Sequence, residues 1–202
     1  MKHYKSLNGF HRENGAEPPE NPLLSLVRLD KICPIKDKEF TTDFYMIALK
    51  KVKSGLFLYG RTKYDNENGS MYFIQHRQVV EMKNLEFEED GFIIFMHEDY
   101  LNGHLLHHEI TKYNYFDYET NEALHLSPKE EQVIWELFFK IEAEYNTNQD
   151  EYSREIILTH LDSILKYSQR FYKRQFINRS EISGKMVTRF NDILSAHIET
   201  GD

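Results

Sequence analysis

The sequence has only one cysteine, Cys33, among its 202 residues. A single thiol excludes an intrachain disulfide, and the first residues hold no long apolar segment of the kind that a secretory signal needs. No run of about 18 apolar residues occurs anywhere, so no segment is predicted to span a membrane. Together these absences predict a protein of the reducing cytoplasm.

An excess of positive charge is missing too. The chain carries 25 lysines and arginines against 33 aspartates and glutamates, which gives a formal net charge of -8. A chain of this charge has no overall basic field that attracts phosphate backbones. On its own it is expected to be a poor DNA binder.

The motifs of common enzyme families are also missing. There is no G-x-S-x-G nucleophile elbow and no glycine-rich loop that could hold phosphates. Cys33 precedes Pro34 in a predicted loop rather than at a helix start. The acidic run 88–90 is predicted to lie in a solvated turn, not to act as a general acid or base. The residues therefore predict no catalytic group and no cofactor.

Histidines offer the only pattern that could bind a metal. His104 and His108 have the i, i+4 spacing that can bind zinc from a helix, and His97 and His107 lie nearby. No second set of histidines and carboxylates follows at the spacing of a metal-binding barrel. The favoured interpretation is that these are ordinary polar, capping or core residues, with His97 capping the turn over residues 100–103. No metal is predicted.

Aromatic residues are abundant, with 14 Phe and 13 Tyr, and they predict a packed globular fold. Residues 1–22 combine glycines and prolines with polar residues and are predicted to be a flexible leader. Beyond them, short runs of aromatic and branched residues are predicted to be strands, over residues 23–29, 43–52, 55–64, 70–75 and 91–96.

The joins between these runs predict antiparallel pairs. Ser54-Gly55 separates the second run from the third, and the DNENG sequence at 65–69 ends in Asn-Gly, which tolerates the positive φ of tight hairpin turns. The second run is then expected to pair with the third, and the third with the fourth.

One predicted strand is apolar on both of its alternating faces. Such a strand is typical of a barrel or sandwich that is also covered on the outside, and the helical half of the chain is the expected cover. The two faces consist of Phe44, Met46 and Ala48 on one side and of Tyr45, Ile47 and Leu49 on the other.

The helical half begins with a strong start sequence. Ser127 can cap the free backbone N–H groups, Pro128 suits the first helical turn, and Glu130 completes a capping box. Apolar residues then recur at helical spacing, which predicts a helix that runs to about Tyr145.

A second helix is predicted over about 150–176, and the short loop before it favours an antiparallel helical hairpin. A third is predicted over about 181–200. Its position at the very end fits either a following domain or a protein that simply ends in a helix. Basic residues near the end of the second helix are interpreted as a solvated or salt-bridging face, with a phosphate track as the alternative: Lys166, Arg170, Lys173, Arg174 and Arg179.

Four longer segments carry a family resemblance: IIFMHEDYL at 93–101, YFDYETNEALHLSPKEE at 115–131, SREIILTHLDSILKYSQRFYKRQF at 153–176 and RFNDILSAHI at 189–198. Together they resemble the N-terminal sensing half of a bacterial AraC-family transcriptional regulator. The resemblance covers nearly everything after the leader. The HLS-x-x-E and RFY-x-RQF segments are its more specific parts.

The resemblance implies an α+β fold. A cupin-like antiparallel β-barrel over 23–126 would be the sensing domain, and a C-terminal helical hairpin with a third helix over 127–202 would be the dimerisation and linker region. In such regulators two helix-turn-helix motifs bind DNA. Those motifs are absent from this sequence, so DNA would be bound only through a missing C-terminal domain.

The residues and the resemblance together predict a homodimer that binds a small effector and passes this signal to attached DNA-binding domains. Small-ligand sites join apolar walls to a few oriented polar groups. Candidate ligand-binding residues on the central strands are therefore Tyr45, Tyr59, Arg61, Tyr72 and His76.

The candidate dimer interface is an apolar stripe on the second helix, although packing within the hairpin competes for some of its residues. Two alternative functions remain. One is a stand-alone cupin-like enzyme with a metal held by His104, His107 and His108; the other is a module that only dimerises. The stripe consists of Ile157, Leu161, Ile164, Leu165 and Tyr172.

Overall fold

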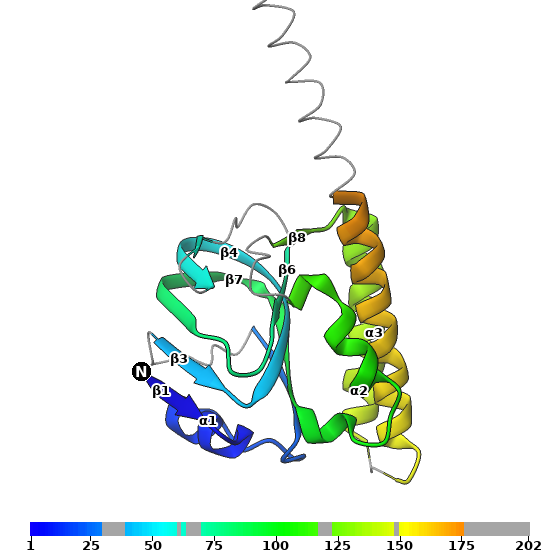
Figure 1. The fold of residues 1–202 in the computed structure, drawn as a ribbon. Helices are drawn as coiled ribbons and strands as arrows, with labels where there is room; N and C mark the ends of the chain where they lie inside the picture. Colours follow the sequence, from blue (N-terminus) through cyan, green and yellow to red (C-terminus); the bar gives the residue numbers. More distant parts are fainter. Residues whose placement is uncertain (30–38, 60–61, 64–69, 117–122, 148–149, 176–202) are drawn as a thin grey trace, which may run out of the picture.

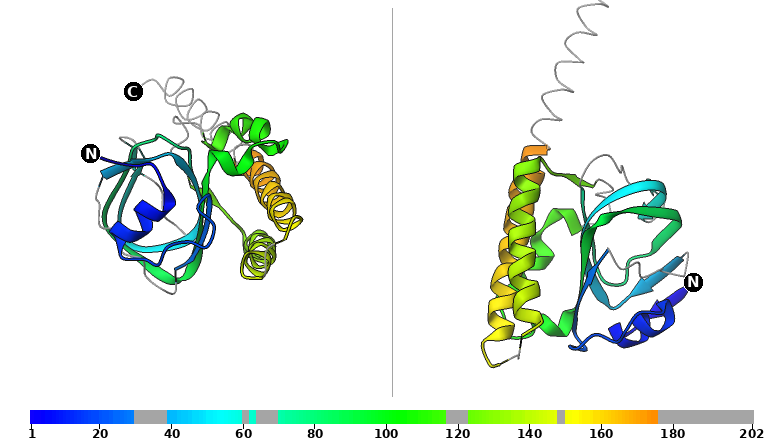
Figure 2. Two further views of the ribbon diagram at one scale, coloured as in Figure 1. Left: turned by 90° about the horizontal axis from the view of Figure 1, so that it is seen from below. Right: turned by 180° about the vertical axis from the view of Figure 1, so that it is seen from behind.

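A computed structural model describes the chain as a curved β-sheet with a helical layer on one face and a short N-terminal helix on the other (Figures 1 and 2). The predicted α+β class is confirmed. The described ranges are 1–29, 39–59, 62–63, 70–116, 123–147 and 150–175, and only the backbone is described for 51–59, 62–63 and 81–90.

The first residues form a strand and a helix, so the prediction of a flexible leader is wrong. Strand β1 (Lys2–Tyr4) pairs in parallel with β3, and helix α1 (Leu7–Asn14) follows it. The Ser6 side chain accepts a hydrogen bond from Gly9 N at 3.2 Å and caps the helix. Gly15, with a φ of 79°, ends it in the left-handed conformation that glycine adopts readily.

Apolar residues of this N-terminal segment explain why it is packed. Tyr4, Leu7 and Phe10 are spaced three apart, and all three are buried against one face of the sheet. Of the glycines and prolines that suggested a leader, Gly9 lies within α1, Gly15 ends that helix, and the prolines lie in the connection to the next strand.

One sheet contains all the strands of the described residues, in the order β1-β3-β7-β4-β6-β8, with β2 beside β7 and β5 beside β4. Apart from the parallel pair of β1 and β3, these pairs are antiparallel. No pairing among the described residues closes the sheet, so the closed barrel is not confirmed. The strands are β2 (Leu24–Arg28), β3 (Glu39–Thr42), β4 (Phe44–Tyr59), β5 (Thr62–Lys63), β6 (Ser70–Ile74), β7 (Val80–His97) and β8 (Leu124–His125).

Strand β4 runs through Ser54-Gly55, where the sequence predicted a turn. Its ladder with β7 shifts register between Lys50 and Leu56, so this glycine lies in an irregular part of one long strand. Strand β6 pairs with the first half of β4, which means that the fourth predicted run pairs with the second and not with the third. The predicted turn at 65–69 lies outside the described residues.

Strand β7 is much longer than the predicted run at 91–96. It begins at Val80, and the acidic run 88–90 lies within the strand rather than in a turn. The ladder with β4 is present on both sides of the acidic run, at Gly91 and at Phe87, and its register shifts between these two residues. The acidic run therefore lies at an irregularity within the strand.

Helices cover one face of the sheet. The long helix α3 (Pro128–Tyr145) and a second long helix over residues 153–175 lie side by side in both views (Figure 2). The predicted helix at 181–200 lies outside the described residues. Between β7 and β8 the chain forms the short helices η1 (Glu98–Leu101), α2 (Leu106–Glu109), η2 (Ile110–Lys112) and η3 (Asn114–Phe116).

Helix α3 begins as the sequence predicted. One carboxylate oxygen of Glu130 accepts hydrogen bonds from the backbone N and the Oγ of Ser127, both at 2.9 Å, and the capping box is formed. At the other end, the Tyr145 hydroxyl donates to Leu24 O at 3.2 Å and fastens the helix to β2.

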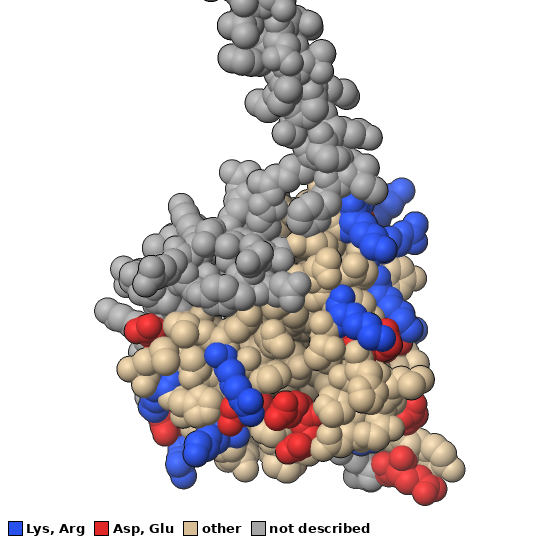
Figure 3. Space-filling model, in the orientation of Figure 1, with Lys and Arg blue, Asp and Glu red and all other residues tan. Residues whose placement is uncertain are grey.

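Charged side chains are unevenly distributed over the helical layer. Figure 3 shows Lys and Arg gathered at the upper right, over the end of the 153–175 helix, and Asp and Glu at the lower right, towards its start. Within the described ranges, no helix is both long and apolar enough to cross a membrane.

The two faces of the sheet bury separate apolar cores. One core is shared with α3 and the 153–175 helix, and the other lies beneath the N-terminal segment. The prediction of a strand covered on both faces is confirmed, although the helical half covers only one of them. Strand β4 contributes Tyr45, Ile47 and Leu49 to the helix-covered core, and Phe44, Met46 and Ala48 to the other.

Candidate functional site

The structure divides the predicted ligand-binding residues between the two faces. Tyr45 belongs to the helix-covered face and lies beside His76, with the ring centroids 5.0 Å apart. Tyr72 belongs to the opposite face. The side chain of Tyr59 and the whole of Arg61 lie outside the described residues.

A buried lysine marks the face that carries Tyr72. Lys50 is 3% exposed, and its Nζ lies 4.9 Å from the centre of the Tyr72 ring, within the range of a cation–π interaction. In the β4/β6 ladder Lys50 is paired with Ser70, and Ala48 is paired with Tyr72, so these side chains share one face. We call Lys50, Ser70 and Tyr72 the interior polar group.

Burial controls the charge of this lysine. Removal from water lowers the pKa of Lys50 from 10.5 to about 7, because the desolvated ammonium is less stable than the neutral amine. The amine can therefore gain or lose a proton near neutral pH. Lysines with such lowered pKa values are typical of functional sites, although structural networks produce them as well.

The strand beside Lys50 approaches very closely. Gly91 of β7 is the pairing partner of Lys50, and a Cβ at this glycine would lie 2.6 Å from Leu49 O and 2.7 Å from Leu29 Cδ1. A larger residue would force the two strands apart. The glycine thus keeps the interior polar group at a fixed distance from the neighbouring strand.

The interior polar group is connected to the end of the long helix. Ser70 Oγ lies 3.1 Å from His125 Nδ1 on strand β8. The Gln175 side chain accepts a hydrogen bond from His125 N at 3.0 Å and donates one to Ala123 O at 3.1 Å, as a neighbouring strand would. Arg174 donates to His125 O at 2.8 Å. We call Arg174 and Gln175 the β8 clamp.

The β8 clamp also reaches the start of helix α3. Arg174 Nη1 lies 2.6 Å from Glu130 Oε2, the same carboxylate oxygen that caps the helix. A charge-assisted contact of this length is among the stronger polar contacts in proteins. One arginine therefore joins strand β8 to both long helices.

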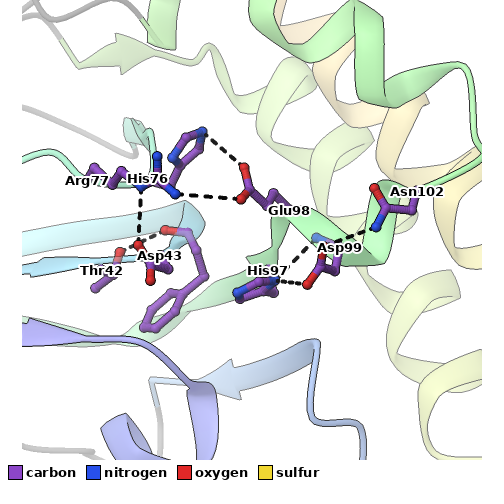
Figure 4. A network of polar contacts seen from close by, with 9 residues as sticks. Thr42, Asp43, His76, Arg77, His97, Glu98, Asp99 and Asn102 are labelled. Atoms are coloured by element: carbon purple, nitrogen blue, oxygen red, sulfur yellow. Dashed lines mark hydrogen bonds and ion pairs between the residues drawn. The ribbon is translucent and has the colours of Figure 1, made fainter.

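A second polar cluster lies where β4 begins, around His76 (Figure 4). Arg77 Nε lies 3.3 Å from Asp43 Oδ1, and its Nη2 lies 3.8 Å from Glu98 Oε1. Glu98 also lies 3.7 Å from His76 Nε2, and Asp43 lies 3.3 Å from His3. We call Asp43, His76, Arg77 and Glu98 the polar junction.

Burial and neighbouring charges shift the pKa values of residues in and beside the polar junction. Burial would raise the pKa of Asp43, but hydrogen bonds from Arg77 and His3 outweigh it and lower that pKa. Burial lowers the pKa of His76, against the opposing effect of Glu98. Burial, with the Glu98 charge, also raises the pKa of Tyr45 to about 12. Tyr45 is therefore neutral and His76 is mainly neutral at pH 7.

His76 keeps one unsatisfied nitrogen. Its Nδ1 is buried and has no hydrogen-bond partner among the described residues, while Nε2 faces Glu98. The Glu98 carboxylate favours a proton on Nε2, which leaves a lone pair on Nδ1. Because Arg77 has a φ of 64°, the turn that carries His76 is also in a conformation uncommon for non-glycine residues.

His97 and His104 have structural roles. His97 Nδ1 accepts a hydrogen bond from Asp99 N at 3.2 Å and caps helix η1, which confirms the predicted capping role. His104 Nδ1 accepts from Leu106 N at 3.0 Å at the start of α2. Among the described residues, no three His, Cys, Asp or Glu side chains are grouped so that they could hold a metal ion.

The predicted dimer stripe is buried within the chain itself. Each of its residues is at most 5% exposed and belongs to the core between the sheet and the helices. Intrachain packing, which the sequence left as a competing possibility, therefore uses the whole stripe, and these side chains are not a free surface: Ile157, Leu161, Ile164, Leu165 and Tyr172.

The basic residues of the second helix are partly in salt bridges. Lys166 Nζ lies 2.7 Å from Asp162 Oδ2, and Arg174 contacts Glu130. These two residues fit the salt-bridging interpretation. Arg179 lies outside the described residues.

Sequence reasoning missed Lys50 and His125. A usable pattern existed for Lys50, since it continues the alternation of Phe44, Met46 and Ala48 and so belongs to a face that is otherwise apolar. No comparable pattern marks His125, because its role depends on a strand of two residues that is held by a distant helix.

Comparison with protein-family models finds no match, and no curated protein matches this sequence.

Proposed function

We propose that this chain is the sensing region of a transcriptional regulator similar to the AraC family. A small effector binds beside the interior polar group and alters the packing of the sheet around Lys50. The effector supplies polar groups to the lysine and apolar surface to its neighbours, as is usual for small-ligand sites. The sensing region itself catalyses no reaction.

The observation that carries this proposal is the continuity of contacts from Lys50 to the helices. Lys50 is paired with Ser70, Ser70 contacts His125, and the β8 clamp holds His125 from the end of the 153–175 helix. A change at the lysine can therefore bias the position of that helix end. Coupling between two sites requires a structural element with two arrangements, and each site must be able to shift the equilibrium between them; here that element is the helix end.

Finer features of the fold belong to the same proposal. We infer that residues 23–126 form a cupin-like barrel, which the strong curvature of the sheet in Figure 2 supports. Residues 127–202 would form a helical hairpin and a third helix, through which two copies associate. DNA would be bound by helix-turn-helix motifs outside these residues, and the protein would work in the cytoplasm.

Melting temperatures test effector binding. A panel of small metabolites is screened against the wild-type chain and the Lys50→Met variant, with Lys140→Met on the exposed face of α3 as the matched control. A compound that binds at the interior polar group raises the melting temperature of the wild type and of the control, but not of Lys50→Met. If no compound shifts the wild type, effector sensing is contradicted.

Hydrogen exchange tests the connection to the helices. A bound compound is expected to slow or speed amide exchange in the 153–175 helix of the wild type. In Gln175→Ala the compound still raises the melting temperature, but the change in helix exchange is lost, whereas Gln132→Ala on α3 behaves as wild type. An unchanged response in Gln175→Ala would show that β8 does not carry the coupling.

A further inference from the structure

Hydrogen bonds at the two ends of β2 fix the direction of the backbone groups along this strand. Just after β2, Leu29 N donates to Gly91 O at 3.0 Å, and just before it His97 N donates to Leu23 O at 2.9 Å. Hydrogen-bonded positions alternate along an antiparallel ladder. The odd-numbered residues of β2 therefore bond to β7, and the even-numbered residues point their N–H and C=O groups away from it.

This outer edge of β2 is closed at one end and open at the other. Leu24 N donates to Asn21 O at 3.4 Å, and Leu24 O accepts the hydrogen bond from the Tyr145 hydroxyl at 3.2 Å. Among the residues that the structure describes, the N–H and C=O groups of Leu26 and Arg28 have no such partner, and both residues are partly exposed. An open strand edge is a template on which another strand can add.

Aromatic rings of helix α3 lie beside the open part of this edge. The guanidinium carbon of Arg28 lies 4.8 Å from the centre of the Trp135 ring and 5.3 Å from that of the Phe139 ring. The buried Phe138 ring lies 5.7 Å from the same carbon. Because Trp135 is half-buried and Phe139 is 47% exposed, part of this aromatic cluster faces outward next to β2.

The Arg28 guanidinium has no acidic partner within the described part of the chain. Its Nη1 is buried and accepts no carboxylate or carbonyl oxygen there as a hydrogen-bond partner. A buried donor without an acceptor is costly, and a hydrogen bond from arginine to a carboxylate is among the stronger ones in proteins. Arginine and tryptophan are also the residue types that most often dominate the binding energy of an interface.

We propose that β2 binds an extended acidic segment of a partner protein, which adds as a strand beside Leu26 and Arg28 and places a carboxylate against the Arg28 guanidinium. The N–H and C=O groups of these two residues form the new ladder. Side chains two apart in the segment face α3, so the acidic one meets Arg28 and an apolar one meets Leu26. The carboxylate reaches Nη1 when one ring moves aside, and Phe139 is the most exposed of the three rings.

The chemistry of the edge selects this partner over others. A small anion would contact the guanidinium but would leave the edge N–H and C=O groups of the strand unpaired. A second copy that pairs through its own β2, with the sequence LSLVR, supplies no carboxylate and brings a second Arg28 close to the first. An extended acidic segment satisfies both the edge and the charge.

This inference does not depend on the proposed function. The interior polar group lies towards the core beneath the N-terminal segment, whereas the side chain of Arg28 lies against α3. Failure of effector binding would leave the β2 edge untouched, and failure of segment binding would leave effector sensing untouched.

Single-residue amide exchange, measured by NMR on the free chain, tests whether the edge is open. The amides of Leu26 and Arg28 should exchange about tenfold or more faster than those of Ser25 and Val27, which the ladder with β7 protects. Equally slow exchange at all four amides would overturn the proposal. Slowing of the Leu26 and Arg28 amides at high protein concentration would show that a second copy is the occupant.

A random-peptide library displayed on phage and selected on the full chain supplies binding probes. The enriched peptides should share an acidic residue with an apolar residue two positions away, and when bound they should slow exchange at the Leu26 and Arg28 amides. The proposal is contradicted if no peptide binds, or if the enriched peptides leave both amides unchanged.

Variants then separate strand addition from simple charge attraction, with the dissociation constants of the enriched peptides measured by fluorescence anisotropy. Leu26→Pro removes the outward N–H but no bond to β7, and it should raise the dissociation constant about tenfold or more. Leu26→Ala keeps that N–H and should change it less than about threefold. Arg28→Leu should also raise it about tenfold, whereas Arg12→Leu, on the exposed side of α1, is the matched control.

Each outcome decides. Weaker binding in both Leu26→Pro and Arg28→Leu supports an added strand with a carboxylate at Arg28. Weaker binding in Arg28→Leu alone would exclude strand addition, and equal binding by all variants would exclude the β2 edge. If Leu26→Pro lowers the melting temperature of the chain, exchange at the Leu26 and Arg28 amides of the peptide-bound wild type decides instead.

Discussion

The two faces of the sheet differ in what they bury, although strand β4 contributes alternating residues to both. On the helix-covered face Tyr45, Ile47 and Leu49 meet an apolar core supplied by two long helices. On the other face the same alternation continues to Lys50, and the cover includes the short segment β1–α1. The first face is built for stability, whereas the second contains a charged group that costs stability to bury.

This difference indicates that a functional site should be sought on the face that carries Lys50. A buried amine is retained against its desolvation cost, and its neighbours connect it to the helix end through β8. Nothing of this kind occurs in the described core beneath the helices. The comparison predicts that changes on the helix-covered face alter stability alone, and that changes around Lys50 also alter titration and ligand response.

The largest effect is expected from Phe138→Ala on the helix-covered face. Phe138 is fully buried and stacks on Phe92 with the ring centroids 4.0 Å apart. Loss of the ring leaves a cavity between helix and sheet and should lower the free energy of unfolding by about 3–5 kcal/mol, measured by urea denaturation. Phe139→Ala, whose ring is 47% exposed, should cost about 1 kcal/mol or less. Equal losses would mean that the stacked pair is not part of the core.

A smaller loss is expected from Phe10→Ala on the other face. Phe10 contacts Tyr4, Phe44 and Phe95 with ring centroids within 5.5 Å. The loss should be roughly 2–4 kcal/mol, because the short segment can detach locally and so limit the cost. Denaturation gives the total, and amide exchange in α1 shows whether the loosening is local. Asn8→Ala, on the exposed side of α1, is the control. If Phe10→Ala lowers the free energy of unfolding no more than this control does, the N-terminal segment is not packed and the prediction of a flexible leader is correct.

A pH-dependent effect is expected from Lys50→Met. The folded pKa of Lys50 is about 7, below the ordinary 10.5, so the unfolded chain binds more protons between these values. Wild-type stability therefore gains, relative to the variant, at most about 1.4 kcal/mol per pH unit as pH rises from 7 towards 10.5.

Denaturation of the wild type, Lys50→Met and the exposed control Lys140→Met across this pH range measures the effect. The difference in the free energy of unfolding between the wild type and Lys50→Met should change with pH. The same difference between the wild type and Lys140→Met should stay constant. A constant difference for both variants would mean that Lys50 keeps an ordinary pKa in the folded chain.

The smallest effect is expected from His76→Leu in the polar junction. Burial lowers the folded pKa of His76 below 6.5, so the folded state disfavours its protonation. Wild-type stability should fall, relative to the variant, as pH drops below about 6.5, by less than about 1.4 kcal/mol per pH unit. Thermal denaturation from pH 7.5 to 5 measures this, with exposed His108→Leu as the control. A wild type that loses no more stability than His76→Leu would show that Glu98 offsets the burial.

Local sequence patterns predicted some elements well. The start of α3 at Ser127 and Pro128 follows from capping chemistry within four residues, and it is found as predicted. The two apolar faces of 44–49 follow from strict alternation, and the structure confirms them. Each of these features depends on neighbours in the sequence, which is why a single sequence reveals it.

Long-range contacts caused the errors. The N-terminal segment was predicted to be flexible because its glycine and prolines suggested turns, yet Phe10 packs against Phe44 and Phe95 from distant strands. The acidic run 88–90 was predicted to be a turn, yet it lies within strand β7, at a register shift between two paired parts of the ladder with β4. Of the predicted ligand residues, Tyr45 and His76 meet, but Tyr72 lies across the sheet.

The sequence by itself determined the α+β class, the capped start of α3 and the alternation that makes both faces of β4 apolar, because backbone periodicity and capping act over a few residues. Only the tertiary structure decided which segment covers each face, that the stripe from Ile157 to Tyr172 is core, and that Lys50 connects through His125 to the end of the long helix. Those outcomes depend on contacts between residues far apart in the chain, where burial and strand pairing outweigh local preference.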